Sequence, residues 1–161
     1  LLEGYHGDCS ATFYVGEARE DARLVTETAR ECLALGIRAV RPDGRIRDIG
    51  AAIEDHAHGK GCSVVQDYCG HGIGREFHAE PQVPHYRFQG RNPRVKPGMT
   101  FTIEPMINLG TWKVDLQGDG WTVLTRDRRL SAQFEHTILV TATGHDVLTD
   151  PAKIAGSKWD I

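Results

Sequence analysis

Three acidic side chains interrupt segments of this chain that are otherwise apolar or β-forming. Glu104 lies within Phe-Thr-Ile-Glu-Pro, Glu135 lies within Gln-Phe-Glu-His, and Asp8 directly precedes an aromatic and β-branched run. Acidic residues are rarely buried in strands unless they are paired or bind a metal ion. Because the three are far apart in sequence, only the fold can bring them together. The pattern therefore suggests a catalytic metal centre built from separate segments.

A histidine supplies the fourth candidate ligand. His71 lies in Cys-Gly-His-Gly-Ile-Gly, where flanking glycines let the backbone come close to a metal or a substrate. On its own, a histidine in such a setting is more often an ordinary loop residue. Together, three carboxylates and one imidazole match oxygen-rich sites for Mn, Co, Fe or Zn. They do not match a structural zinc site, which would favour cysteine.

The strands that carry the two glutamates indicate where these side chains point. Side chains alternate along a strand, so Glu135 shares a polar face with Gln133 and Thr137. Pro105 follows Glu104 directly and ends or edges the strand there. Site residues are common at such strand ends. Both carboxylates are therefore expected to lie at positions suited to a site.

Composition and charge exclude several classes of protein. The chain has 161 residues, 40% of them hydrophobic, which is enough for one domain with a core. The net charge of −3 gives no global basic field for nucleic acid. The short basic run at residues 126–129 is interpreted as the tip of a solvated hairpin. No apolar run approaches the ~20 residues that span a bilayer, so no membrane partner is expected.

The four cysteines form no CxxC pair, which argues against a zinc ribbon or a thioredoxin motif. A chain with a normal core does not need disulfides, so we expect reduced thiols and a cytoplasmic location. Glu3-Gly4 predicts a hairpin turn, yet almost no strand precedes it. We therefore expect this chain to be the C-terminal part of a longer protein.

The periodicity predicts one strand, two helices and then mostly antiparallel strands, which is an α+β order. The helices are expected at 17–35, ended by Gly36, and at 47–58, ended by glycines 59 and 61. The strands are expected at 9–15, 62–65, 99–107 and 144–148, with a hairpin made by 121–125 and 131–141. Residues 70–98 are rich in glycine and proline and are expected to form a long ordered loop of functional importance.

Five motifs carry a family resemblance, and together they cover most of the chain. They are HGDCS at 6–10, YCGHGIGREFHAEPQVPHY at 68–86, VKPGMTFTIEPMIN at 95–108, DGWTVLTRDRRLSAQFEHTILVT at 119–141 and GHDVLT at 144–149. The chain resembles the C-terminal part of the type I methionine aminopeptidases, which have the pita-bread fold. Only 32 residues (72 to 103) separate His71 from Glu104, which leaves no room for the helical insertion of the type II enzymes.

The resemblance implies a single metallopeptidase catalytic domain over residues 1–161 and a set of metal ligands. Asp8, His71, Glu104 and Glu135 would bind metal, with Asp8 and Glu135 bridging two ions and the other two completing the first site. The implied cofactors are divalent ions such as Co, Mn, Fe or Zn. The implied reaction removes the initiator methionine from a nascent polypeptide, through attack of a metal-activated water on the scissile carbonyl.

The resemblance also implies roles for residues around the ligands. His78 would contact the substrate amide and stabilise the tetrahedral intermediate, and Glu104 would shuttle the proton. Phe77 and Trp121 would line the pocket for the methionine side chain. Gln133 would lie next to the ligands and belong to the substrate-binding residues. The expected partner is the N-terminus of a nascent polypeptide, encountered at the ribosome.

One feature departs from the family pattern. A further aspartate ligand lies upstream of the position of Asp8, and in this chain it would precede Leu1. We therefore expect a pita-bread fold that is incomplete at the N-terminus, a compromised second metal site, and poor activity or solubility of the chain alone. Two alternatives stay open: a related Xaa-Pro peptidase, and an inactive binding module.

Overall fold

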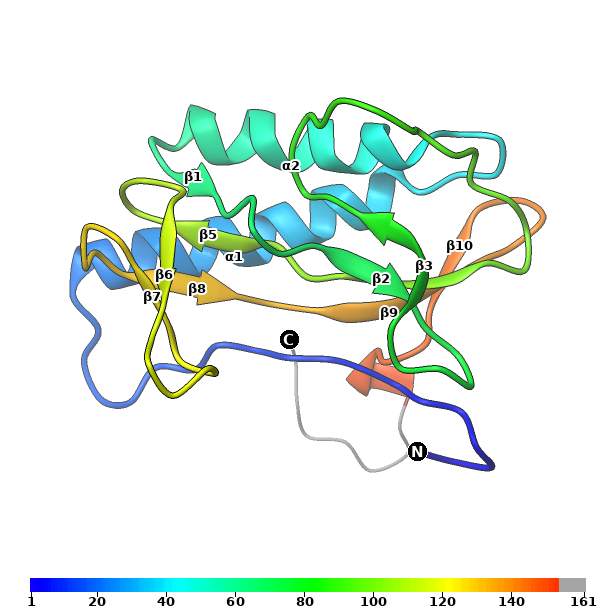
Figure 1. Ribbon diagram of the computed structural model, residues 1–161, viewed down its shortest axis with the longest axis horizontal. Helices are drawn as coiled ribbons and strands as arrows, with labels where there is room; N and C mark the ends of the chain where they lie inside the picture. The colour runs from blue at the N-terminus through cyan, green and yellow to red at the C-terminus, as the bar shows by residue number, and fades with distance from the viewer. Residues whose placement is uncertain (154–161) are drawn as a thin grey trace.

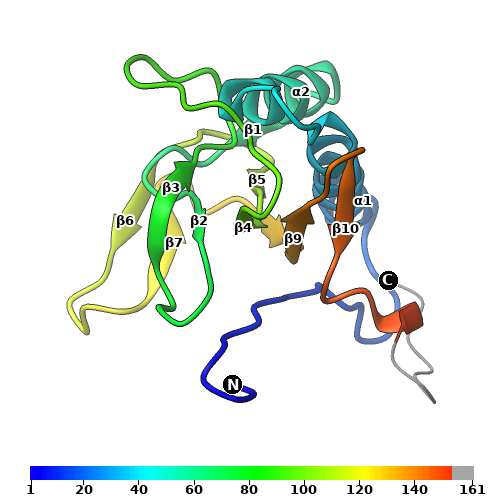
Figure 2. The ribbon, with the colours of Figure 1, turned by 90° about the vertical axis from the view of Figure 1, so that its right-hand side faces the viewer.

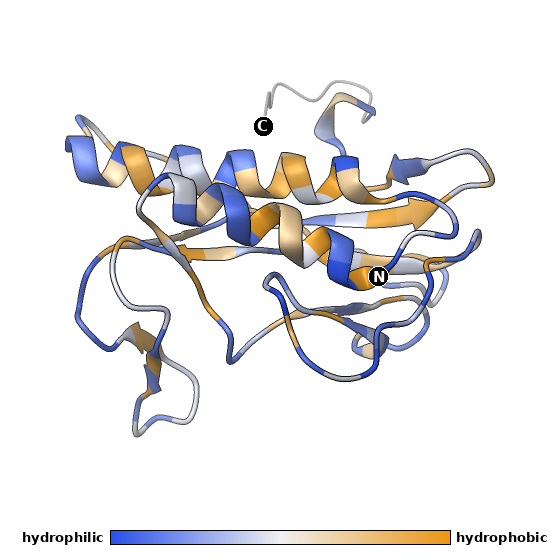
Figure 3. Cartoon of the chain, turned by 90° about the horizontal axis from the view of Figure 1, so that it is seen from above, coloured by the Kyte–Doolittle hydropathy of each residue, from blue (hydrophilic) through white to orange (hydrophobic). Residues whose placement is uncertain are grey.

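Two helices lie on one side of the strands in the computed structural model, which describes residues 1–153 (Figure 1). They are α1 (Glu20–Ala39) and α2 (Ile46–Gly59). The two helices pack against each other, α1 contacts strands β4, β5 and β8, and α2 contacts β1 and β3. Viewed from above, both helices cover the strands and extend roughly along them (Figure 3). The predicted α+β class is confirmed.

Helix α1 begins later and ends later than its sequence pattern predicts. Its buried face includes Val25, Ala29 and Cys32, which recur at helical spacing. The predicted end at Gly36 is wrong, because the helix continues to Ala39. A Cβ at Gly36 would lie 2.8 Å from Cδ1 of Ile53, so this glycine allows α1 and α2 to pack closely. Helix α2 matches its prediction and is followed by Gly61 at φ +73°.

The strands form three antiparallel sheets. The larger sheet has the order β10-β9-β4-β2-β3, with bounds β10 (His145–Val147), β9 (His136–Val140), β4 (Thr100–Ile103), β2 (Gly70–Gly72) and β3 (Ala79–Val83). The second has the order β1-β5-β8, with bounds β1 (Ser63–Val64), β5 (Met106–Asn108) and β8 (Ser131–Gln133). The third pairs β6 (Val114–Leu116) with β7 (Val123–Thr125), and the short 3-10 helix η1 (Pro151–Lys153) ends the described chain.

The two larger sheets are joined by two chain segments that run through both. One segment forms β4 and then β5, interrupted at Glu104-Pro105. The other forms β8 and then β9, and its interruption includes Glu135. The pairs Ile103↔His136 and Met106↔Gln133 place the two interruptions opposite each other. The glutamates therefore lie where two neighbouring strands both break their ladder.

The hydrophobic core lies between the helices and the sheets. Fully buried sheet residues such as Phe101, Ile107 and Ile138 belong to one cluster with the helix residues Ile49 and Ile53. Burial of each large apolar side chain contributes roughly 1.5–3 kcal/mol relative to exposure. The core therefore holds the helices to one face and leaves the opposite side of the strands for the N-terminal segment.

The N-terminal segment runs in extended form along the side of the strands away from the helices (Figure 2). The predicted turn at Glu3-Gly4 is confirmed, with a bridge between Leu2 and Tyr5. The predicted strand 9–15 is wrong: its backbone pairing with the sheets is a single bridge between Ser10 and Glu135. Both edges of β9 are already taken by β4 and β10, which limits the pairing to the interruption.

Two further predictions from the sequence need correction. Residues 70–98 are not one loop, because β2 and β3 form within them and pair with each other. The predicted hairpin of 121–125 with 131–141 is also wrong. Strand β7 pairs with β6, and β8 pairs with β5. The strands predicted at 62–65, 99–107 and 144–148 are present in shortened form, the middle one divided at Pro105.

Glycine at position 72 is required by the close approach of β2 to β3. A Cβ at Gly72 would lie 2.1 Å from the carbonyl oxygen of Glu80. Since backbone cannot yield as a side chain can, we expect Gly72→Ala to cost about 1–3 kcal/mol of unfolding free energy. Gly74→Ala is the matched control, because its Cβ would meet nothing within 4 Å. Urea unfolding of both variants checks this, and equal stabilities would contradict it.

Within residues 1–153, no helix is long and apolar enough to cross a membrane.

Candidate metal centre

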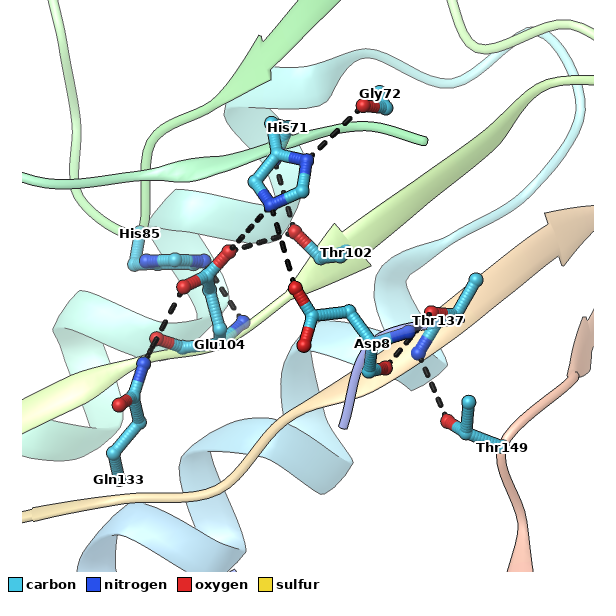
Figure 4. A network of polar contacts seen from close by, with 9 residues as sticks. All are labelled: Asp8, His71, Gly72, His85, Thr102, Glu104, Gln133, Thr137 and Thr149. Carbon is cyan, nitrogen blue, oxygen red and sulfur yellow. Dashed lines mark hydrogen bonds and ion pairs between the residues drawn. The ribbon is translucent and has the colours of Figure 1, made fainter. Parts of the chain in front are cut away.

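Four side chains predicted as ligands converge from four different segments. Figure 4 shows three of them, Asp8, His71 and Glu104. Asp8 comes from the N-terminal segment, His71 from β2, Glu104 from the break after β4, and Glu135 from the break before β9. Ligand atoms of Asp8, His71 and Glu135 all lie within 4.8 Å of one another. Nε2 of His71 lies 3.6 Å from Oε1 of Glu104 and 3.8 Å from Oδ2 of Asp8. The fold thus brings all four side chains close together.

Asp8 is held against β9 through its backbone. Its N–H donates to Oγ1 of Thr137 at 3.0 Å, and the Thr137 hydroxyl donates to the carbonyl of Asp8 at 2.8 Å. Two residues further on, the N–H of Glu135 donates to the carbonyl of Ser10 at 2.9 Å. These bonds leave the carboxylate of Asp8 free to point towards His71, as Figure 4 shows.

His71 is oriented by a bond on the far side of its ring. Nδ1 lies 3.0 Å from the carbonyl oxygen of Gly72, which can only accept, so we assign the proton to Nδ1. Nε2 then presents its lone pair to the carboxylates of Asp8 and Glu104. A metal-binding histidine commonly donates its other ring N–H in this way, which fixes tautomer and ring direction.

Glu104 is fixed at its backbone and at its carboxylate. Its N–H donates to Nε2 of His85 at 3.1 Å, and its carbonyl accepts from Nε2 of Gln133 at 3.2 Å. The Thr102 hydroxyl donates to Oε1 at 2.7 Å. Burial, followed by repulsion from Asp8, raises the pKa of the Glu104 carboxyl above its ordinary value.

Glu135 is the member of the cluster whose charged form is most disfavoured by its surroundings. The residue is 6% exposed, and its Oε1 has no hydrogen-bond partner among the described residues. Burial raises the pKa of this carboxyl to about 8, with repulsion from Glu104 and Asp8 acting in the same direction. An unpartnered buried carboxylate oxygen is costly unless a cation satisfies it.

The donor set fits a divalent metal ion. Within residues 1–153, no lysine or arginine forms an ion pair with Asp8, Glu104 or Glu135; the basic group beside them is His71. Three carboxylates and one imidazole therefore gather without a permanent positive charge to balance them. A bound dication would supply that charge and satisfy the free oxygen of Glu135. Oxygen and imidazole ligands suit Mn, Fe, Co and Zn.

The cluster lies in an open cavity of about 1060 Å³. His78 lines this cavity, and its ring centroid lies 4.3 Å from that of His71. Phe77 lies beside both histidines, with ring centroids 5.6 Å from His71 and 4.5 Å from His78. Gln133 also lines the cavity and bonds to Glu104. The structure thus brings His78, Phe77 and Gln133 to the ligands.

Trp121 is not brought to the ligands. It lies on the connection between β6 and β7, and the residue is 87% exposed. It is not among the residues that line the cavity. Its backbone N–H donates to Oδ1 of Asp119. Two strand residues of the same hairpin, Val114 and Val123, do line the cavity. The proposed role of Trp121 stays a prediction.

Two buried residues that support Glu104 were not identified from the sequence. Thr102 and His85 are both completely buried, and both bond to Glu104. Thr102 lies two positions before Glu104, so strand alternation offered a signal for it. His85 offered none beyond its position near a motif, since its contact with Glu104 is made only by the fold.

Comparison with known proteins agrees with this geometry. Residues 1–142 match the family described as metallopeptidase family M24. The chain therefore belongs to this family, whose members use divalent metal ions. Methionine aminopeptidase A of Synechocystis is 56% identical over 149 residues, which cover 92% of this chain and 59% of that protein. Thus the chain spans little more than half the length of this curated relative.

Solved structures show the same fold. The crystal structure of methionine aminopeptidase from Rickettsia prowazekii matches with a TM-score of 0.89 at 46% identity, covering 92% of this chain and 60% of the other. Prolidase from Pyrococcus furiosus matches with a TM-score of 0.69 at 25% identity, covering 92% and 38%. The predicted pita-bread fold is thereby confirmed, as a part of the fold of these longer chains.

Proposed function

We propose that this chain forms the metal-binding part of an aminopeptidase that removes the N-terminal methionine from nascent polypeptides. The observation that carries the proposal is the convergence of Asp8, His71, Glu104 and Glu135 in one open cavity. Higher identity to methionine aminopeptidases than to the prolidase supports this specificity. Residues 1–161 would act as one catalytic domain.

The four ligands would hold the first metal ion, which can be Mn, Co, Fe or Zn. Asp8 and Glu135 would also contribute to a second ion, as in the two-metal pattern of the family, with weaker binding there. A bound dication supplies a Lewis acid for the scissile carbonyl and lowers the pKa of a nearby water. The chain's contribution is to fix the ligands and to leave Oε1 of Glu135 available to the ion.

Glu104 would transfer the proton, and His78 would contact the substrate amide. Burial and the charge of Asp8 raise the pKa of the Glu104 carboxyl above its ordinary value, and a carboxylate with a raised pKa accepts a proton more readily. His78 lines the cavity beside His71 and would donate to the substrate as charge develops on the carbonyl oxygen. Phe77 and Trp121 would bound the methionine side chain, and Gln133 would hold Glu104 in place.

The polypeptide N-terminus would be presented at the ribosome, in the cytoplasm. Four unpaired cysteines support a reducing compartment. No nucleic acid or membrane contact is part of this proposal. The substrate-bearing partner is therefore the nascent chain itself, recognised by its free amine and its methionine side chain.

A peptide panel separates the leading function from its alternatives. We expect slow, Mn²⁺-dependent release of methionine from Met-Ala-Ser by the purified chain, in keeping with the poor activity expected of the chain alone, and no release from Ala-Pro-Ala. EDTA should stop the reaction, because the ligands are arranged for a dication. Faster cleavage of Ala-Pro-Ala would favour the Xaa-Pro alternative. A chain that binds no Mn²⁺ and cleaves neither peptide would favour the binding module.

A further inference from the structure

One buried hydroxyl connects two of the proposed metal ligands. Oγ1 of Thr102 accepts the backbone N–H of His71 at 2.9 Å and donates to Oε1 of Glu104 at 2.7 Å. Thr102 lies on β4 and is fully buried, while His71 lies on the neighbouring strand β2. The same hydroxyl thus contacts ligands from two strands, as the dashed lines in Figure 4 show.

This contact joins β2 to β4 at the His71 end of a short pairing, whose other end has the Ile73 N–H donating to the carbonyl of Thr100 and the Thr100 hydroxyl donating to the carbonyl of Ile73. Their ladder register consists of the pair Gly72↔Phe101. Close approach is possible because position 70 is a glycine, whose Cβ would lie 2.4 Å from the carbonyl oxygen of Thr102. With so short a ladder, the hydroxyl of Thr102 is a principal link between His71 and the strand that carries Glu104.

The hydroxyl also selects the direction of the Glu104 carboxylate. A hydroxyl has a single proton, and the backbone N–H of His71 already occupies one of its acceptor positions. The proton must therefore point to Oε1, the oxygen that lies 3.6 Å from Nε2 of His71. His85 and Gln133 hold the backbone of Glu104 on either side of its Cα. Among the described residues, the carboxylate accepts hydrogen bonds from Thr102 and, at 3.4 Å, from Nε2 of Gln133.

We propose that Thr102 is a positioning residue whose hydroxyl sets His71 and Glu104 in the arrangement of a single metal ion before any ion binds. This rests on the proposed function, since it requires that the cluster bind metal. Groups that orient ligands in this way change metal affinity about 10- to 100-fold when removed. The hydroxyl does not touch the substrate and acts only through the two ligands.

The test is a calorimetric titration of MnCl₂ into the full 161-residue chain and its variants. Thr102→Val keeps the shape and removes the hydroxyl, and should weaken Mn²⁺ binding about 10- to 100-fold. Thr102→Ser keeps the hydroxyl and should bind within about threefold of the unmodified chain. Thr28→Val is the matched control, because the hydroxyl of Thr28 is also buried but bonds within α1, to the carbonyl of Leu24.

The effects of each substitution on Mn²⁺ affinity and on stability are measured separately. Thermal unfolding of each metal-free variant reports stability separately, so a loss of stability without a loss of affinity would overturn the inference. So would Mn²⁺ binding by Thr102→Val equal to that of the unmodified chain, or an equal loss in Thr28→Val. If Thr102→Val does not fold, Thr102→Ala against Thr102→Ser isolates the hydroxyl. If the unmodified chain binds no Mn²⁺, the proposed function fails first and the inference with it.

Discussion

Glu135→Gln is expected to weaken Mn²⁺ binding by about 100-fold or more and to abolish methionine release. Glutamine has nearly the same shape but cannot supply the negative charge, and its amide has one oxygen instead of two. Glu135 is buried, and within residues 1–153 its Oε1 has no hydrogen-bond partner, so this oxygen is available to a metal ion. Calorimetric titration with MnCl₂ and a Met-Ala-Ser assay measure the two effects.

Glu27→Gln provides the control for the loss of one negative charge. Glu27 is partly exposed on α1, where it pairs with Arg30 at 2.6 Å, away from the cluster. We expect this variant to bind Mn²⁺ as the unmodified chain does, because a surface ion pair contributes little. Unchanged Mn²⁺ affinity in Glu135→Gln would contradict the assignment of Glu135 as a ligand.

The contribution of Glu135 is expected to make the metal-free chain less stable as pH rises from about 6.5 to 8. Below pH 6.5 the buried His85, whose pKa burial lowers to about 3, acts in the opposite direction. The folded pKa of Glu135 is about 8, against an ordinary value of 4.5, so the folded chain binds more protons than the unfolded chain between these values. The stability that Glu135 contributes is therefore greatest below the lower value and is lost as Glu135 ionises. Because the cavity is open to solvent, we expect a loss of about 2 kcal/mol. Glu104 contributes in the same direction.

Urea unfolding in EDTA at several pH values measures this loss. Glu135→Gln should flatten the profile, since the group that ionises is gone. Adding Mn²⁺ should restore the stability of the unmodified chain at high pH, because a ligand that binds only the folded state stabilises it by mass action. The account would be contradicted by a metal-free chain that gains stability between pH 6.5 and 8, or by an identical profile in the variant.

The sequence predicted which side chains converge better than it predicted the strand pairing. The alternation of Gln133, Glu135 and Thr137 placed these three on one face, and each bonds to or lies beside another part of the cluster. The break at Pro105 was predicted by the same local reasoning, since proline lacks the N–H that a ladder needs. Local rules sufficed wherever the determining chemistry was local.

Pairing partners could not be predicted because they are non-local. Strand β8 follows β7 closely in sequence, yet it pairs with β5, while β7 pairs with β6 across a turn at Gly120. Glycine is typical of a helix end, so the sequence predicted that α1 ends at Gly36. Gly36 lies inside α1 instead, because Ile53 of α2 packs against it. His85 was missed for the same reason, since its bond to Glu104 joins residues 19 positions apart.

Metal content per chain tests the central claim most directly. The purified chain would be equilibrated with MnCl₂, dialysed and analysed for metal and protein by elemental analysis. The four converging ligands predict about one Mn²⁺ retained per chain, and its loss in Glu135→Gln. A chain that keeps no Mn²⁺, or a variant that keeps as much as the unmodified chain, would contradict the account of this cluster as a metal centre.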